Sequence, residues 1–292
     1  LSSADFAMSK IATYGDRGRN LRKLIDYFCH LALAPHAYDD IKANDTEFAA
    51  SGHLQSIAWL KDDSDDLYDP SYGDVIRVAG LVGFNRGKAS SIVSELSGRD
   101  PDTRKVDESR IPAAYDRLEG ALDALVKKYN FENFLMTIKS AGFISPNMIG
   151  SKNALNFTYA LYLRLRTQGE LAEGERKRIV RRWFVMSMLT GRHSGSFEST
   201  WEQDVRRIST LGAAAYLKQI EESELTDGFW QVALPAALET TSTTSPYFQT
   251  FLAAQVSSGA RGFLSKRITV GAMHQQSGDI HHIVPKDYLQ KH

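Results

Sequence analysis

The last fourteen residues, Asp279 to His292, carry the strongest chemical signal in the sequence and read D-I-H-H-I-V-P-K-D-Y-L-Q-K-H. Two histidines, His281 and His282, are adjacent in this stretch. Imidazole can both ligate a divalent metal and act as a general base near neutral pH. Hydrolysis of a phosphodiester uses both functions, because a metal holds the scissile phosphate while a base activates water. The pair therefore indicates a hydrolytic site for phosphodiesters.

A simpler interpretation is that the histidine pair has no function. Pairs of this kind occur on surface strands, and an ideal strand directs adjacent side chains to opposite faces. Both rings could serve one metal only if the backbone bends near the end of the strand. The stretch from Asp279 to Val284 has the alternating, β-branched character of a short strand, and Gly278 and Pro285 flank it. We therefore predict a strand here and a second short strand over Lys266 to Val270.

The D-I-H-H-I-V-P stretch resembles the first half of the motif of HNH (ββα-metal) nucleases. The resemblance implies that His281 is a metal ligand, with Mg²⁺ or Mn²⁺ as the expected ion, and that His282 is the catalytic general base. The family places an Asn, and a final His or Asn, further downstream. No residue up to His292 can be assigned to these two roles. We expect the nuclease part of this chain to be incomplete and inactive alone.

Three more stretches extend the resemblance over most of the chain. They are L-S-S-A-D-F-A-M-S-K-I-A at the start, M-L-T-G-R-H-S-G-S-F-E-S at 188–199 followed by Asp204, and S-P-Y-F-Q-T-F-L at 245–252. Together they resemble the GmrSD-type, modification-dependent (type IV) restriction endonucleases. This resemblance implies phage defence in the cytoplasm by a ParB-like domain that hydrolyses nucleotide, a helical region and an HNH domain that cuts DNA. Residues Leu1 to Lys10 would end the ParB-like domain, so any nucleotide would bind outside this chain.

Composition limits how the protein could bind DNA. The chain has 292 residues, of which 42% are hydrophobic and 24% charged, and this is ordinary for a globular protein. Lys plus Arg and Asp plus Glu both number 35, so DNA binding would depend on local basic patches.

The single cysteine, Cys29, excludes an internal disulfide and fits a reducing cytosol. No apolar run could span a bilayer, so we expect no membrane partner.

Helical periodicity dominates the chain, and the predicted fold is mainly α: a multi-helix, bundle-like body with the first strands of a ββα-metal core at the C-terminus. The stripe formed by Leu21, Leu24, Ile25, Phe28 and Leu31 is typical of a helix with one buried face. A polar loop over Leu96 to Ser109 suggests the division into a helical subregion at 1–108, a helical body at 109–262 and the nuclease start at 263–292. The pattern also predicts long single helices from Pro112 to Tyr129 and from Glu198 to Glu222.

The strongest basic patch lies on the helix predicted over Glu175 to Leu189. Arg178, Arg181 and Arg182 share one face there, and guanidinium groups at helical spacing suit a phosphate backbone. Arg192, Lys266 and Arg267 complete the predicted DNA-binding set. Arg192 and His193 belong to a loop between two helices, a position that often carries function. A salt-bridged surface is an equally good explanation of the arginines.

The acidic stretch from Lys61 to Asp69 contains five aspartates. An EF-hand would require a central Gly and a closing Glu at fixed spacing, and the stretch has neither, so we predict a solvated acidic loop.

The sequence leaves two functions open. The first is part of a metal-dependent DNA endonuclease. The second is a non-enzymatic helical module that couples partners, as a homo-oligomer or with a partner subunit. The D-I-H-H-I-V-P stretch favours the first, and the missing second half of the motif favours the second.

Overall fold

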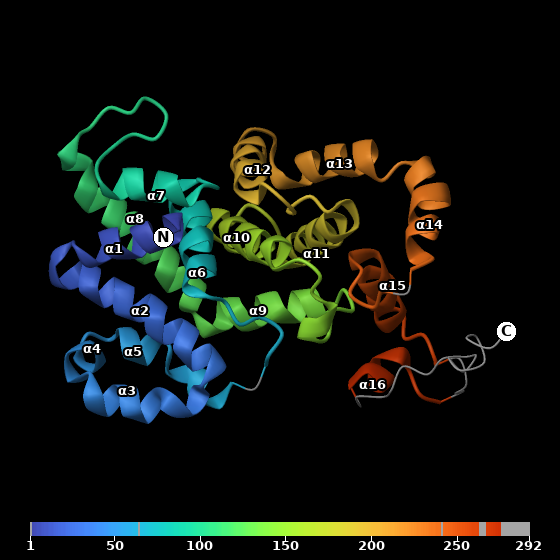
Figure 1. Cartoon of the computed structure of the whole chain (residues 1–292), viewed down its shortest axis with the longest axis horizontal. Coiled ribbons are helices and arrows are strands. Elements are labelled where there is room, and N and C mark those ends of the chain that lie inside the picture. The colour runs from blue at the N-terminus through green and yellow to red at the C-terminus, as the bar shows by residue number, and fades with distance from the viewer. Residues whose placement is uncertain (1, 64, 241, 263–266, 276–292) are drawn as a thin grey trace, which may run out of the picture.

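The structure is a computed structural model that describes residues 2–63, 65–240, 242–262 and 267–275. Helices dominate these residues, as predicted (Figure 1). The pairings of sheet type among them are two isolated bridges, Arg99 with Val106 and Arg261 with Thr269. The strand predicted over Lys266 to Val270 is therefore wrong for its described residues, because Thr269 makes a single bridge and a helix begins at Val270. The strand predicted over Asp279 to Val284 lies outside the described residues.

The described helices fall into an N-terminal and a C-terminal set. The first set comprises α1 (Ser3–Ala12), α2 (Gly15–Leu33), α3 (Tyr38–Asn44), α4 (Thr46–Ala50), α5 (His53–Ser56), α6 (Tyr72–Ala79), α7 (Ala89–Leu96) and α8 (Ile111–Val126). The second set comprises α9 (Lys128–Lys139), α10 (Lys152–Gln168), α11 (Glu173–Thr190), α12 (Phe197–Leu211), α13 (Ala213–Glu224), α14 (Leu234–Leu238), α15 (Pro246–Ser257) and α16 (Val270–Gln275). Two π-helical segments, η3 (Gly80–Phe84) and η6 (Phe229–Ala233), extend α6 and precede α14.

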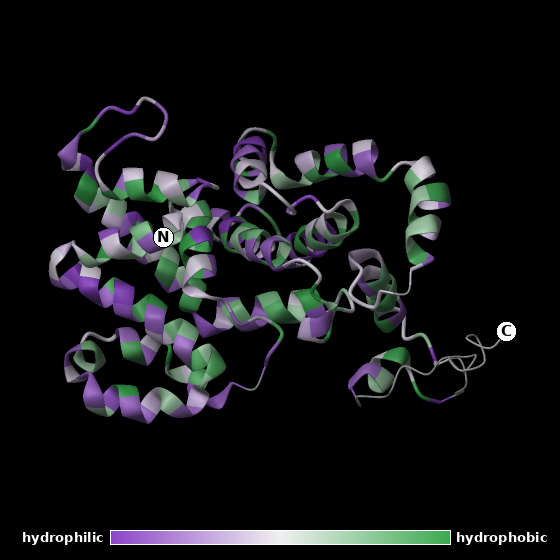
Figure 2. Ribbon diagram, in the orientation of Figure 1, coloured by the Kyte–Doolittle hydropathy of each residue, from purple (hydrophilic) through white to green (hydrophobic). Residues whose placement is uncertain are grey.

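Local sequence signals explain where several helices begin. The Ser2 hydroxyl accepts a hydrogen bond from the Asp5 amide, and the Asp5 carboxylate accepts one from the Ser2 amide, which closes a capping box at the start of α1. Ser71 and Asp74 form the same arrangement at the start of α6. The five-residue stripe predicted for α2 is fully buried. Figure 2 shows hydrophilic residues along the other side of this helix.

Two predicted helices are too long, and each breaks at one residue. The helix predicted up to Tyr129 ends at Val126, because Lys127 adopts an extended backbone (ψ 118°). Tyr129, the predicted end of this helix, is exposed in α9 and lies under the guanidinium of Arg166. The helix predicted over Glu198 to Glu222 is α12 and α13, which are separated by Gly212 at a φ of 82°. A left-handed φ of this kind ends a helix and favours glycine.

The core is organised around α10, which lies between α6 and α11 (Figure 1). Every residue from Ala154 to Leu163 is buried, as expected for a helix that is covered on all sides. The buried Asn156 amide donates to the Asp74 carboxylate at 2.7 Å, and its oxygen accepts from the Tyr68 hydroxyl at 2.8 Å. These bonds satisfy an amide that would otherwise be costly to bury.

Buried side chains on both sides of residue 108 belong to one hydrophobic cluster, and Leu96 and Ala114 are both members. The boundary predicted at residue 108 lies at the start of η4 (Glu108–Arg110), a short 3-10 helix between α8 and the loop that stands out from the body after α7 (Figure 1). The division into 1–108 and 109–262 stays a prediction. Among the described residues, no helix combines the length and apolar character needed to cross a membrane.

Candidate functional site

The predicted catalytic residue His282, the predicted metal ligand His281 and the predicted DNA contact Lys266 lie outside the described residues. The other predicted contacts are described. Arg267 is exposed just before α16, and it is not among the residues that line the groove described next. Of the predicted DNA contacts, Arg178, Arg181 and Arg182 lie together on one face of α11.

The sequence explains how α11 presents these arginines. Ile179, Trp183 and Met186 are buried against the core, and Gly191 ends the helix with a φ of 61°. The three arginines occupy positions i, i+3 and i+4 on the other side, and such positions are neighbours on a helix surface.

The arginine face of α11 forms one wall of a groove of about 570 Å³. We call it the α11 groove. The other walls come from the turn after α9, from α13 and its C-cap, from η6 and from α15. The groove is lined by Ser140, Ala141, Phe143, Arg178, Arg181, Arg182, Val185, Met186, Leu189, Glu221, Leu225, Trp230, Thr250, Ala254, Ser257 and Ser258. Half of these side chains are apolar, so the groove combines apolar surface with guanidinium groups.

The three arginines of the groove differ in how they are paired. Arg182 forms a bidentate ion pair with Glu221 of α13, with the Nε–Oε1 contact at 3.1 Å. Arg178 is 62% exposed and reaches Glu175 only at 3.9 Å, so this pair is weak. Arg181 is half-buried and has no hydrogen-bond or ion-pair partner among the described residues. The net positive charge of the groove therefore comes from Arg178 and Arg181.

Arg192, a predicted DNA contact, points into the protein and not toward a ligand surface. Its Nε and Nη2 atoms donate to Asp204 at 3.0 Å and 2.6 Å, and its Nη1 atom donates to Glu224 at 3.0 Å. Nη2 also donates to the Tyr216 hydroxyl at 2.8 Å. The side chain is only 13% exposed. Because its donors already bond to protein groups, we assign Arg192 a structural role in place of the predicted contact with DNA.

His193 is buried beside Arg192 and donates from Nε2 to Asp204 at 3.1 Å. Its Nδ1 atom is buried without a partner, which fits a neutral ring whose proton is on Nε2. A second proton on Nδ1 would be an unsatisfied buried donor. Burial accordingly lowers the pKa of His193, although Asp204 acts in the opposite direction. The loop that sequence analysis marked as functional thus closes a buried polar cluster formed by Arg192, His193, Asp204 and Tyr216, with the exposed Glu224 at its edge.

Trp230 and Glu221 are groove residues that sequence analysis did not select. The available signal in the sequence was the apolar segment from Phe229 to Leu238. None of its residues is buried, and Trp230 is 47% exposed. Exposed apolar segments of this kind are candidates for contact with another molecule.

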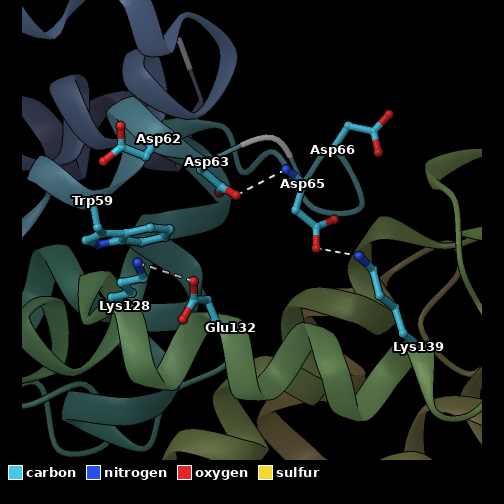
Figure 3. Close-up of a pocket in the computed structure, with 8 residues that line it drawn as sticks. All are labelled: Trp59, Asp62, Asp63, Asp65, Asp66, Lys128, Glu132 and Lys139. Atoms are coloured by element: carbon cyan, nitrogen blue, oxygen red, sulfur yellow. Dashed lines mark hydrogen bonds and ion pairs between the residues drawn. The ribbon is translucent and has the colours of Figure 1, made fainter.

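The acidic loop forms a separate, polar pocket of about 390 Å³ (Figure 3). Lys139 of α9 forms an ion pair with Asp65, and Lys128 lies 3.7 Å from Glu132. Asp63 accepts a hydrogen bond from the Asp65 amide at 3.1 Å. The prediction of an acidic loop without EF-hand geometry fits this arrangement. In the described part of the chain, no three His, Cys, Asp or Glu side chains are grouped so that they could hold a metal ion.

Comparison of the chain with protein-family models, with curated proteins and with solved structures found no match.

Proposed function

We propose that this chain is the helical body and nuclease start of a metal-dependent DNA endonuclease of the HNH type, which acts in the restriction of modified phage DNA. The observation that carries the proposal is the D-I-H-H-I-V-P stretch at residues 279–285. In this proposal His281 holds a divalent cation, Mg²⁺ or Mn²⁺, which would stabilise charge on the scissile phosphate. His282 takes the proton from the attacking water.

The α11 groove supplies the basic surface that the proposal requires. The chain has no net charge, so a DNA backbone must be held by local guanidinium groups. Arg178 and Arg181 offer donors that are not committed to a close carboxylate among the described residues. Arginine suits phosphate because its planar group presents a fixed fork of donors. Arg182 contributes less, since Glu221 neutralises it.

A second candidate function is a non-enzymatic helical module that couples partner proteins. The specific observation in its favour is the segment from Phe229 to Leu238, which is almost entirely apolar and has no buried residue. The ion pairing of many arginines within the protein also fits this function. Examples are Arg77 with Glu198, Arg86 with Glu202 and Arg182 with Glu221.

Cleavage of supercoiled plasmid separates the two functions. The full-length gene product that contains this chain is incubated with modified or unmodified plasmid, in Mg²⁺ or Mn²⁺ and with or without added nucleotide. The endonuclease predicts nicked or linear product that requires the metal. The coupling module predicts intact plasmid in every combination.

A further inference from the structure

The α11 groove has more apolar surface than contact with a phosphate backbone requires. We propose that it binds one unpaired nucleotide of a DNA strand, with the base against the apolar wall beside Trp230 and its phosphate on Arg178 and Arg181. This inference rests on the proposed function, because it takes DNA as the ligand. It adds that the groove selects a nucleotide that has left the paired duplex.

The phosphate part of the proposal rests mainly on Arg181. This side chain is half-buried, and no described residue forms a hydrogen bond or ion pair with it. Its guanidinium donors are therefore available to a bound phosphate, whose oxygens match the planar fork of an arginine. Arg178 is one helical turn away on the same face and pairs only weakly with Glu175.

The base part of the proposal rests on the apolar wall. Val185 of α11 and Ala254 of α15 are accessible apolar residues of the groove, and the buried Met186 and Leu189 complete its apolar lining. Trp230 stands at the edge of this surface, and the protein holds its ring in place. Its Nε1 atom donates to the Leu225 carbonyl at 2.9 Å, and the Phe229 ring packs edge-on against it, with ring centroids 5.2 Å apart. A half-exposed tryptophan held in this way is a platform for base stacking.

The size of the groove also fits a single nucleotide. A volume of about 570 Å³ lies within the range of roughly 300–1,000 Å³ that is typical of small-ligand sites. The Ser140 and Thr250 hydroxyls donate to the Thr137 and Pro246 carbonyls, so they offer only acceptor lone pairs to a base or sugar. Ser257 adds a further hydroxyl to the lining. In a paired duplex each base is stacked on both faces, so a groove that covers a base face must take an unpaired one.

The test compares two labelled DNA hairpins that differ by one unpaired thymidine, with binding of the 292-residue chain measured in EDTA. EDTA separates binding from any cleavage. We expect the hairpin with the unpaired nucleotide to bind roughly tenfold more tightly, as base–aromatic stacking typically contributes.

Trp230→Ala should abolish the preference, and Trp230→Phe should restore most of it. Arg181→Ala should weaken binding and lower the slope of log affinity against log salt by about one.

The matched controls are Arg22→Ala, which removes an exposed arginine of α2 paired with Asp26, and thermal unfolding of each variant. Equal affinity for the two hairpins would overturn the inference, as would a preference that survives Trp230→Ala. Binding of an acidic helical peptide that competes with the hairpin, without preference for the unpaired nucleotide, would instead assign the groove to a protein partner.

The inference and the proposed function can fail separately. If the full-length gene product cleaves plasmid but the hairpins bind equally, only the inference fails. If the preference for the unpaired nucleotide holds but no metal-dependent cleavage occurs, the groove binds DNA and the endonuclease proposal fails.

Discussion

Asp204 illustrates how strongly a single buried side chain can determine the arrangement around it. Its carboxylate is fully buried and accepts hydrogen bonds from Arg192, from His193 and from the Tyr216 hydroxyl. These bonds hold its pKa below the usual value, although burial acts in the opposite direction. The same environment, with burial as the main cause, raises the pKa of Tyr216 to about 12.

Replacing Asp204 with Ala should destabilise the protein by about 3–5 kcal/mol, because it leaves the charge of Arg192 buried with only a partly exposed Glu224. Urea unfolding followed by circular dichroism measures the change. The control is Glu222→Ala, which removes an exposed ion pair with Lys218 on α13 and should change stability by less than about 0.5 kcal/mol. Similar losses in the two variants would contradict the structural role of the Asp204 cluster.

His193 should make stability depend on pH in the weakly acidic range. Burial lowers its pKa in the native state, so below about pH 6.5 the unfolded chain binds a proton that the native protein does not. Stability is therefore retained above pH 6.5 and decreases as the pH falls toward the lower native pKa. Urea midpoints at pH 7.5 and 5.5 should differ less in His193→Gln than in the wild type. His30→Gln, at an exposed position, should keep the wild-type difference, and a wild-type midpoint that is higher at pH 5.5 would refute the account.

At the scale of elements, the hydrophobic stripes could be predicted and the helix breaks could not. The stripe of α2 is a local property of the sequence, and so are the capping boxes of α1 and α6. Lys127 ends a helix inside a sequence that continues the helical period, because packing of the following helix overrides local preference. Gly212 is a local helix-ending residue, but the apolar period continues on both sides of it and hides the break. Contacts such as Arg192 with Asp204 join side chains twelve residues apart on different elements, and periodicity does not reveal them.

Gly142 holds the turn after α9 against α15. Its φ is 94°, and a Cβ atom would lie 1.8 Å from the Ala253 carbonyl oxygen. Gly142→Ala should destabilise the protein by about 1–3 kcal/mol through backbone strain and overpacking. Gly120→Ala is the control, because Gly120 lies inside α8 with open space around it and should gain roughly 0.5–1 kcal/mol. Thermal or urea unfolding compares the two, and equal effects would show that α15 does not pack as described.

At the scale of the whole molecule, the chain has no net charge, so DNA binding depends on where the individual basic groups lie. Arg178, Arg181 and Arg182 could be selected from the sequence as one face of a helix. Their unequal pairing could not, because it depends on Glu221 of another helix. The apolar wall beside them also comes from α13, η6 and α15, which only the tertiary structure brings to α11. The proposed catalytic pair, His281 and His282, stays a prediction from the sequence.

Replacing all three arginines with Ala should reduce the slope of log DNA affinity against log salt by about two, since Arg178 and Arg181 are proposed to contact phosphates. Fluorescence anisotropy at several salt concentrations measures this slope. A triple Ala variant at Arg19, Arg22 and Lys23, on the basic side of α2, provides a control of equal charge change and should leave the slope unaltered. If the α11 variant keeps the wild-type slope, this patch does not contact DNA.

The most direct test of the central claim is metal-dependent nicking of supercoiled plasmid by the full-length gene product, compared with its His282→Ala variant. The proposed general base predicts cleavage in Mg²⁺ or Mn²⁺ that the variant loses while it still binds DNA with wild-type affinity. Equal cleavage by both proteins would contradict the role of His282. Intact plasmid with both proteins, on modified and unmodified DNA and with nucleotide present, would contradict the endonuclease and favour the helical coupling module.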